Sequence, residues 1–148
     1  MIKDLKYLMA YSIAIIAFIG ILAGGPLVYL TVVYTFIFIP ILESNTKEYK
    51  NEYSDDEKKN RNLDPFFDFL LYLNIPIVFG IFFVSLNTLL YTNSVSEVIG
   101  IIISASIVMA TNGINVAHEL GHRKSLFSRT CSKLLYLPSV SYTHLRAH

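Results

Sequence analysis

The sequence predicts an all-α integral membrane protein with four transmembrane helices, arranged as two hairpins. Three stretches contain no Asp, Glu, Lys or Arg, at 7–42, 69–96 and 98–118. Uncharged apolar stretches longer than about 18 residues are typical of membrane spans. Apolar residues make up 53% of the 148-residue chain, above the share of about 45–50% that is usual for soluble domains. The length allows one domain.

The first uncharged stretch is too long for one helix. At 1.5 Å per residue, 7–42 would reach about 54 Å, against a hydrocarbon core of about 30 Å. The sequence Gly24-Gly25-Pro26 lies in its middle and favours a break. We therefore predict helices over about 7–23 and 27–42. A second span follows at once and no small-residue cleavage site precedes it, so a removed signal peptide is not expected.

The second hairpin is predicted from the two later stretches. The third helix covers about 66–91 with Pro76 inside it, and the fourth covers about 95–120. The turn between them is Thr92-Asn93-Ser94. No helix breaker lies between Val116 and Leu120, so the fourth helix is expected to continue through the polar sequence there.

The distribution of cations predicts the orientation. Positive charges precede the first helix, lie between the second and third, and follow the fourth: Lys3, Lys6, Lys47, Lys50, Lys58, Lys59, Arg61, Arg123, Lys124, Arg129 and Lys133. The two opposite loops, around 24–26 and 91–97, contain neither Lys nor Arg. By the positive-inside rule, the N-terminus, the 43–64 loop and the end of the fourth helix are cytoplasmic. The net charge of +1 indicates nothing about partners, but the 43–64 segment mixes seven acids with five bases, which is typical of a solvated connector and not of a nucleic-acid-binding patch.

The end of the fourth helix carries the sequence NVAHELGHRK, from Asn115 to Lys124. HELGH fits the zinc-protease pattern H-E-x-x-H, and it also fits the H-x-x-x-H of membrane di-iron oxygenases. His118 and His122 are four residues apart and share one helix face, which makes them candidate metal ligands. The structural alternative is a pair of interfacial histidines beside cations. Because ionisable groups at membrane depth are usually functional, we favour metal binding.

Two histidines do not complete a metal site. Catalytic zinc uses three protein ligands and a water, and iron sites also require more. No His precedes the pair, and the nearby acids Glu43, Asp64 and Asp68 are scattered. Asn115 shares the histidine face and could orient an imidazole, as could Thr111 a turn earlier, although ordinary interhelical hydrogen bonding is the alternative. The single Cys131 lies on the predicted cytoplasmic side and has no assigned role.

Three motifs in the region 32–124 resemble the membrane-bound alkane 1-monooxygenases of the fatty-acid-desaturase/hydroxylase superfamily. They are FIFIPILE at 36–43, PFFDFLLYLNIP at 65–76 and NVAHELGHRK at 115–124. The resemblance implies a six-helix enzyme of the bacterial inner (plasma) membrane with a di-iron centre at its cytoplasmic end. Such an enzyme hydroxylates the terminal carbon of n-alkanes with O2 and electrons from rubredoxin. His118 and His122 would be iron ligands, with Asn115 and Glu119 supporting them and no separate catalytic residue assigned.

Three alternatives remain open at this stage. The substrate could be an acyl chain, because a desaturase or another lipid hydroxylase of the same superfamily shares the first histidine motif. In a membrane zinc protease, Glu119 would act as general base on a zinc-bound water. A non-enzymatic membrane protein is the third alternative.

The last nine residues, VSYTHLRAH at 140–148, depart from the family pattern, which continues with E-H-N-x-G-H-H. They resemble a translated sequencing adapter, so we expect the native domain to cover 1–139. On that interpretation the chain is the N-terminal part of the six-helix enzyme and lacks most of the iron ligands.

Overall fold

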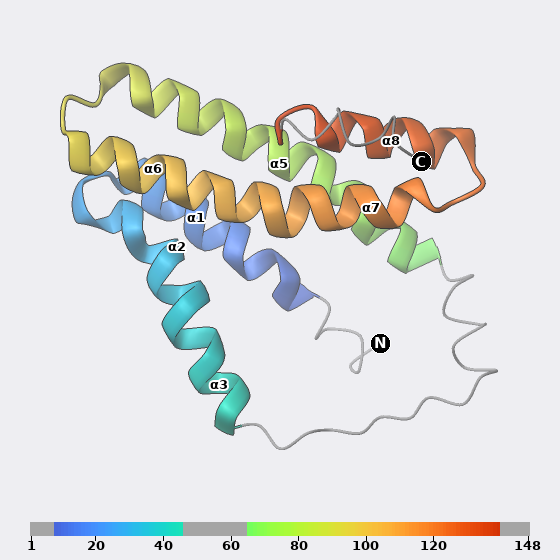
Figure 1. The fold of residues 1–148 in the computed structure, drawn as a ribbon, viewed down its shortest axis with the longest axis horizontal. Helices are drawn as coiled ribbons and strands as arrows, with labels where there is room; N and C mark the ends of the chain where they lie inside the picture. The colour runs from blue at the N-terminus through green and yellow to red at the C-terminus, as the bar shows by residue number, and fades with distance from the viewer. Residues whose placement is uncertain (1–7, 46–64, 140–148) are drawn as a thin grey trace.

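The computed structural model describes residues 8–45 and 65–139, and every regular element in these ranges is a helix. Four features of the sequence analysis lie outside the described residues: Lys3, Lys6, most of the 43–64 loop and the tail at 140–148. Figure 1 shows α5 (Pro65–Tyr91) antiparallel to the continuous helix α6–α7 (95–121), with α1 (Ser12–Ala23) beside them, whereas α3 (Ile39–Asn45) diverges from these helices.

The first hairpin turns where the sequence predicted a break. Helix α1 (Ser12–Ala23) ends at Gly24 and Gly25, whose φ angles of 69° and 56° are ones that residues with side chains rarely adopt. The second helix then consists of four consecutive segments with different helical hydrogen bonding. They are the 3₁₀ turn η2 (Gly25–Tyr29), α2 (Leu30–Val33), the π-helical η3 (Tyr34–Phe38) and α3 (Ile39–Asn45).

The second hairpin agrees with its predicted bounds to within one residue. Helix α5 (Pro65–Tyr91) continues through Pro76. After a short turn, three segments form one continuous helix: α6 (Val95–Val108), the π-helical η4 (Met109–Ile114) and α7 (Asn115–Gly121). The helix therefore continues through His118 as predicted, and His122 is the C-cap residue just after its end.

Three of the described helices are long and apolar enough to cross a membrane, namely Gly25–Asn45, Phe66–Tyr91 and Val95–Gly121. These helices are compatible with an integral membrane protein. The first apolar helix, Leu8–Ala23, is shorter than 18 residues, and about 20 residues are needed to span a hydrocarbon core of about 30 Å. The fourth transmembrane span, like the six-helix context, stays a prediction.

Small side chains let α1, η2 and α6 approach closely. The buried residues of this part of the core are Ala14, Ala17, Ile21, Val28, Ile81, Ile101, Ala105 and Val108. At the hairpin turns, the backbone N–H of Gly25 donates to Glu97 Oε1 over 2.8 Å, and Tyr29 Oη donates to the Ser96 carbonyl. The two hairpin turns therefore lie together at one end of the bundle, and α7 lies at the other end (Figure 1).

Helix α8 (Leu126–Tyr136), which is not among the helices predicted from the sequence, folds back along α7 (Figure 1). Its buried face consists of Ser128, Cys131, Ser132 and Leu135. Ser132 Oγ donates to the Ala117 carbonyl over 2.6 Å, which fixes α8 against α7. The 122–125 turn is therefore the tip of a helical hairpin.

Candidate metal centre

The side chains of His118 and His122 lie together at the end of α7. Both are exposed, their Nε2 atoms are 3.1 Å apart, and their ring centroids are 4.5 Å apart with the ring planes at 90°. Two nitrogens that bind one metal ion at about 2.1 Å, with an angle of 90–109° between the bonds, lie about 3.0–3.4 Å apart. The pair therefore has the spacing of two ligands on one ion. It is equally the spacing of an N–H···N hydrogen bond between neutral imidazoles.

The opposite face of α7 determines the direction in which the histidines point. Ala117 and Leu120 are fully buried and pack with Val78, Cys131 and Leu135. These contacts fix the rotation of α7 between α5 and α8, so the two imidazoles project from the remaining, exposed face. The orientation of the two histidines is thus set by the buried side chains on the opposite face of α7, and not by contacts of the histidines themselves.

The two predicted supporting residues differ in their surroundings. Asn115 is exposed, and among the described residues its amide makes no hydrogen bond to either imidazole. Glu119 is also exposed, and its charge acts on the Arg123 guanidinium one turn later. A supporting role for either residue stays a prediction.

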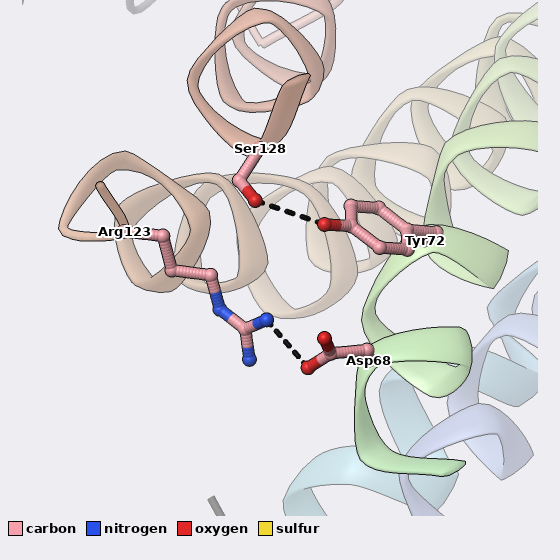
Figure 2. A network of polar contacts seen from close by, with 4 residues as sticks. All are labelled: Asp68, Tyr72, Arg123 and Ser128. Carbon is pink, nitrogen blue, oxygen red and sulfur yellow. Dashed lines mark hydrogen bonds and ion pairs between the residues drawn. The ribbon is translucent and has the colours of Figure 1, made fainter. Parts of the chain in front are cut away.

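Figure 2 shows two polar links that join α5 to the helical hairpin. Arg123 Nη1 donates to Asp68 Oδ1 over 2.5 Å, and the hydroxyls of Tyr72 and Ser128 lie 2.9 Å apart. Tyr72 also packs edge-on against Phe127, with the ring centroids 5.1 Å apart. The two links hold the tip of the hairpin against the first turns of α5, beside the histidine pair.

The charge of Arg123 is fixed by its surroundings. Partial burial lowers the pKa of its guanidinium. The hydrogen bond to Asp68 and the negative charge of Asp68 raise this pKa by more, and the charge of Glu119 raises it further. The net result is a raised pKa. From the sequence, Arg123 is expected to be a flanking cation and Asp68 a scattered acid, and their pairing is not predicted. The available signal was that Asp68 is the one acid in the apolar sequence 65–96.

A second polar cluster lies within the bundle. Asn112 Nδ2 donates to Asn74 Oδ1 over 2.9 Å and to the Ala10 carbonyl over 3.3 Å, and Thr111 Oγ1 donates to Asn112 Oδ1. Asn74 Nδ2 donates to the Leu70 carbonyl, which also accepts from Tyr11. Thr111 therefore takes part in structural hydrogen bonding in η4. A π-helical segment next to a candidate site is a common arrangement in proteins.

The described residues provide only part of a metal site. No group of three or more His, Cys, Asp or Glu side chains in 8–45 and 65–139 is placed to hold one ion. The imidazole pair fits as two ligands, and further ligands are required for zinc or iron.

An apolar groove lies between α1 and the second helix. Its volume is about 330 Å³, and the residues that line it are Ile16, Ile19, Leu30, Val33, Tyr34 and Phe38. The lining has no charged group.

Comparisons of this chain with known protein families, with curated proteins and with solved structures found no match.

Proposed function

We propose that this chain supplies the first histidine pair of a membrane-bound di-iron oxygenase. The reaction is hydroxylation of the terminal carbon of an n-alkane, with O2 as oxidant and rubredoxin as electron donor. The observation that carries the proposal is the geometry of His118 and His122, whose Nε2 atoms lie 3.1 Å apart on the exposed face of α7. This face ends a helix that is long enough to span a membrane.

The apolar character of the bundle supports this class of substrate. An alkane has no polar group by which a site could orient it, so it has to be bound by shape and apolar contact. The described helices offer such surfaces, including the groove lined by Ile16 and Phe38. The apolar tail of an acyl chain is bound by the same kind of surface, so a desaturase or lipid hydroxylase is the nearest alternative within the proposal.

The residues of this chain would hold and orient the metal. His118 and His122 would each donate one imidazole nitrogen, which requires the neutral form of the ring. The bound iron would supply the activation of O2. Packing of Ala117 and Leu120, with the Asp68–Arg123 and Tyr72–Ser128 links, would keep the two nitrogens at a fixed spacing.

The chain offers a matched control for metal binding, because it has four histidines. The protein, purified in detergent, is dialysed anaerobically to equilibrium against Fe(II), and the iron bound per chain is measured without desalting, because two ligands are expected to bind iron only weakly. We expect iron retention to fall in His118→Ala and in His122→Ala. The double variant His144→Ala/His148→Ala should retain as much iron as the parent, because the tail histidines are not assigned to the site.

Other outcomes would contradict the proposal. Preferential retention of zinc, with peptide-bond cleavage that Glu119→Gln abolishes, would identify a zinc protease. Metal retention that does not depend on His118 or His122 would leave the pair as an interfacial structural feature.

A further inference from the structure

Helix α8 runs antiparallel to η4 and α7 over its whole length (Figure 1). Ser132 contacts Ala117 and lies beside Gly121, whereas Leu135 and Ser139 lie beside Gly113. The beginning of α8 is therefore level with the end of α7. Its last turn is level with Gly113, inside the third candidate span, Val95–Gly121.

The level of Gly113 gives the depth that α8 reaches. The uncharged sequence of the fourth helix extends to His118, and Gly113 precedes it by five residues, or about 7 Å along the helix. The charges on α8 follow the same gradient. Arg129 and Lys133, the second of them at the start of the last turn of α8, precede an uncharged sequence from Leu134 to Ser139.

The outer surface of α8 carries four exposed apolar side chains beside Arg129, Thr130 and Lys133, and of these four Phe127 is partly covered by the Tyr72 ring. The exposed fractions are 79% for Leu126, 64% for Phe127, 39% for Leu134 and 57% for Leu137. Soluble proteins do expose single apolar side chains, but here four of them belong to a helix of 11 residues and the turn that follows it.

Three carbonyls at the deep end of α8 are hydrogen-bonded, which a lipid environment favours. The Leu134 and Tyr136 carbonyls accept from the N–H groups of Leu137 and Ser139, and the Leu135 carbonyl accepts from Ser139 Oγ. The last carbonyls of a helix have no partner within regular α-helix. Unpaired polar groups are not tolerated in the hydrocarbon region.

We propose that α8 re-enters the membrane from the side that carries the histidine pair. Leu134 and Leu137 contact lipid acyl chains, and Arg129 and Lys133 lie at the level of anionic headgroups. Charge complementarity favours this partner, because the described residues after Glu119 include four cations and no acid. Long cationic side chains keep their charge at the interface while their stems cover apolar surface. The inference does not depend on a bound metal.

The test uses two reporter positions that match in chemistry and in helix face. The chain contains no Trp, so a single substitution gives an unambiguous fluorescence signal. Leu126 and Leu137 are about three turns apart on the same side of α8. Leu126→Trp and Leu137→Trp are reconstituted in vesicles of phosphatidylcholine and phosphatidylglycerol. The acyl chains are brominated either near the headgroup or near the chain end.

A re-entrant α8 predicts different depths for the two reporters. Trp at 137 should be quenched strongly by both brominated lipids, whereas Trp at 126 should be quenched by aqueous acrylamide and only weakly by bromine near the headgroup. Leu134→Trp serves as a second deep reporter if the Leu137 variant does not fold. Slow maleimide labelling of the buried Cys131 confirms that α8 remains docked in each variant.

Three results would overturn the inference. Equal, shallow quenching at both positions would mean that α8 lies flat in the interface. Acrylamide quenching of Trp at 137, without lipid quenching, would place the helix in water or against a soluble acidic partner. Protection of Trp at 137 from both quenchers would mean that protein covers this face.

Discussion

At the scale of single residues, Asn112 connects more of the bundle than any residue that the sequence analysis selected. Its side chain is 3% exposed and bonds to Asn74 of α5, to the Ala10 carbonyl and to Thr111. In an apolar bundle these bonds have no competition from water, so the loss of one partner leaves buried polar atoms unpaired. The polar atoms of this cluster therefore specify how three helices fit together.

Replacing Asn112 by Leu keeps the size of the side chain and removes its hydrogen bonds. We expect Asn112→Leu to lower the free energy of unfolding by about 1–2 kcal/mol, because Asn74 Oδ1 loses its donor. The measurement is unfolding by SDS in mixed micelles, followed by circular dichroism. Asn87→Leu, at an exposed position of α5, is the control and should change stability little.

A double variant separates the cost of the unpaired atom from the loss of the bond. In Asn74→Leu/Asn112→Leu both partners are apolar, so the combined effect should be smaller than the sum of the two single effects. Additive effects would show that the two side chains contribute independently.

At the scale of the element, close approach of α6 to η2 depends on Gly100. A Cβ atom there would lie well inside the contact distance of Val28 Cγ2 and 3.1 Å from the Tyr29 ring. Gly80 of α5 is also helical, but a Cβ atom there would meet nothing within 4 Å. The two glycines therefore differ in packing and share the same backbone conformation.

We expect the matched pair of Gly→Ala substitutions to act in opposite directions. Gly100→Ala should lower the free energy of unfolding by about 1–3 kcal/mol through overpacking. Gly80→Ala should leave it unchanged or raise it by up to about 1 kcal/mol, because Ala favours helix more than Gly does. Equal effects of the two substitutions in the same micelle titration would refute the close contact.

Docking of α8 can be followed through Cys131, the single cysteine of the chain. The side chain is 5% exposed, and burial raises the pKa of its thiol. Both effects slow alkylation, which requires an accessible thiolate. Gly121→Leu should push Ser132 and α8 away, because a Cβ atom at Gly121 already lies 3.2 Å from Ser132 Oγ. We expect alkylation at pH 7.5 about tenfold faster, the effect of about 1.4 kcal/mol of lost docking energy.

The pH dependence of this docking has a definite sign. The pKa of Cys131 is higher in the docked state than in the undocked state, so docking favours the protonated thiol. The protonated thiol therefore contributes its full share to the free energy of docking below the ordinary thiol pKa of about 8.5, and this share declines as the pH rises above that value. Alkylation should therefore accelerate above that pH more steeply than the thiolate fraction alone predicts. Gly80→Leu is the control and should behave as the parent.

The sequence predicted the hairpins well because their signals are simple. Long uncharged stretches locate α5 and α6–α7, and Gly24-Gly25-Pro26 locates the first turn. Helix α8 has a clear amphipathic pattern in the sequence, but the cations after His122 also fit the flank of a membrane span, and that interpretation is the one preferred from the sequence alone. Its packing on α7 could not be predicted, because three of the four residues on its buried face are the small side chains Ser128, Cys131 and Ser132. The π-helical segments have no comparable signal in the sequence.

Only the local part of the candidate site, the placement of the two histidines on one helix face, could be predicted from the sequence. The i, i+4 spacing of His118 and His122 implies one face, and the structure shows the rings adjacent. The Asp68–Arg123 link joins residues 55 positions apart, so it depends on how the helices pack. The metal role of the pair, and the supporting roles of Asn115 and Glu119, stay predictions because the geometry alone is shared by a hydrogen-bonded pair.

At the scale of the whole molecule, the fold separates two chemically different ends. The turns at 24–25 and 92–94 lie together and are joined through Glu97, and neither contains Lys or Arg. Arg123, Lys124, Arg129 and Lys133 follow the histidine pair in the turn after α7 and in α8, and these two helices lie at the opposite end (Figure 1). In a membrane, this asymmetry predicts that the cationic end faces the cytoplasm.

Two single-cysteine variants test that orientation. In a Cys131→Ser background, Asn93→Cys and Lys124→Cys place a thiol at exposed positions of the two ends. We expect a membrane-impermeant maleimide to label Cys at 93 in intact spheroplasts and Cys at 124 only after lysis, because cations retain their side of the bilayer during insertion. Reversed labelling would place the histidine pair outside the cell, where a rubredoxin-type donor could not reach it. Labelling of both thiols in intact spheroplasts would show that α5 and α6–α7 do not cross the membrane.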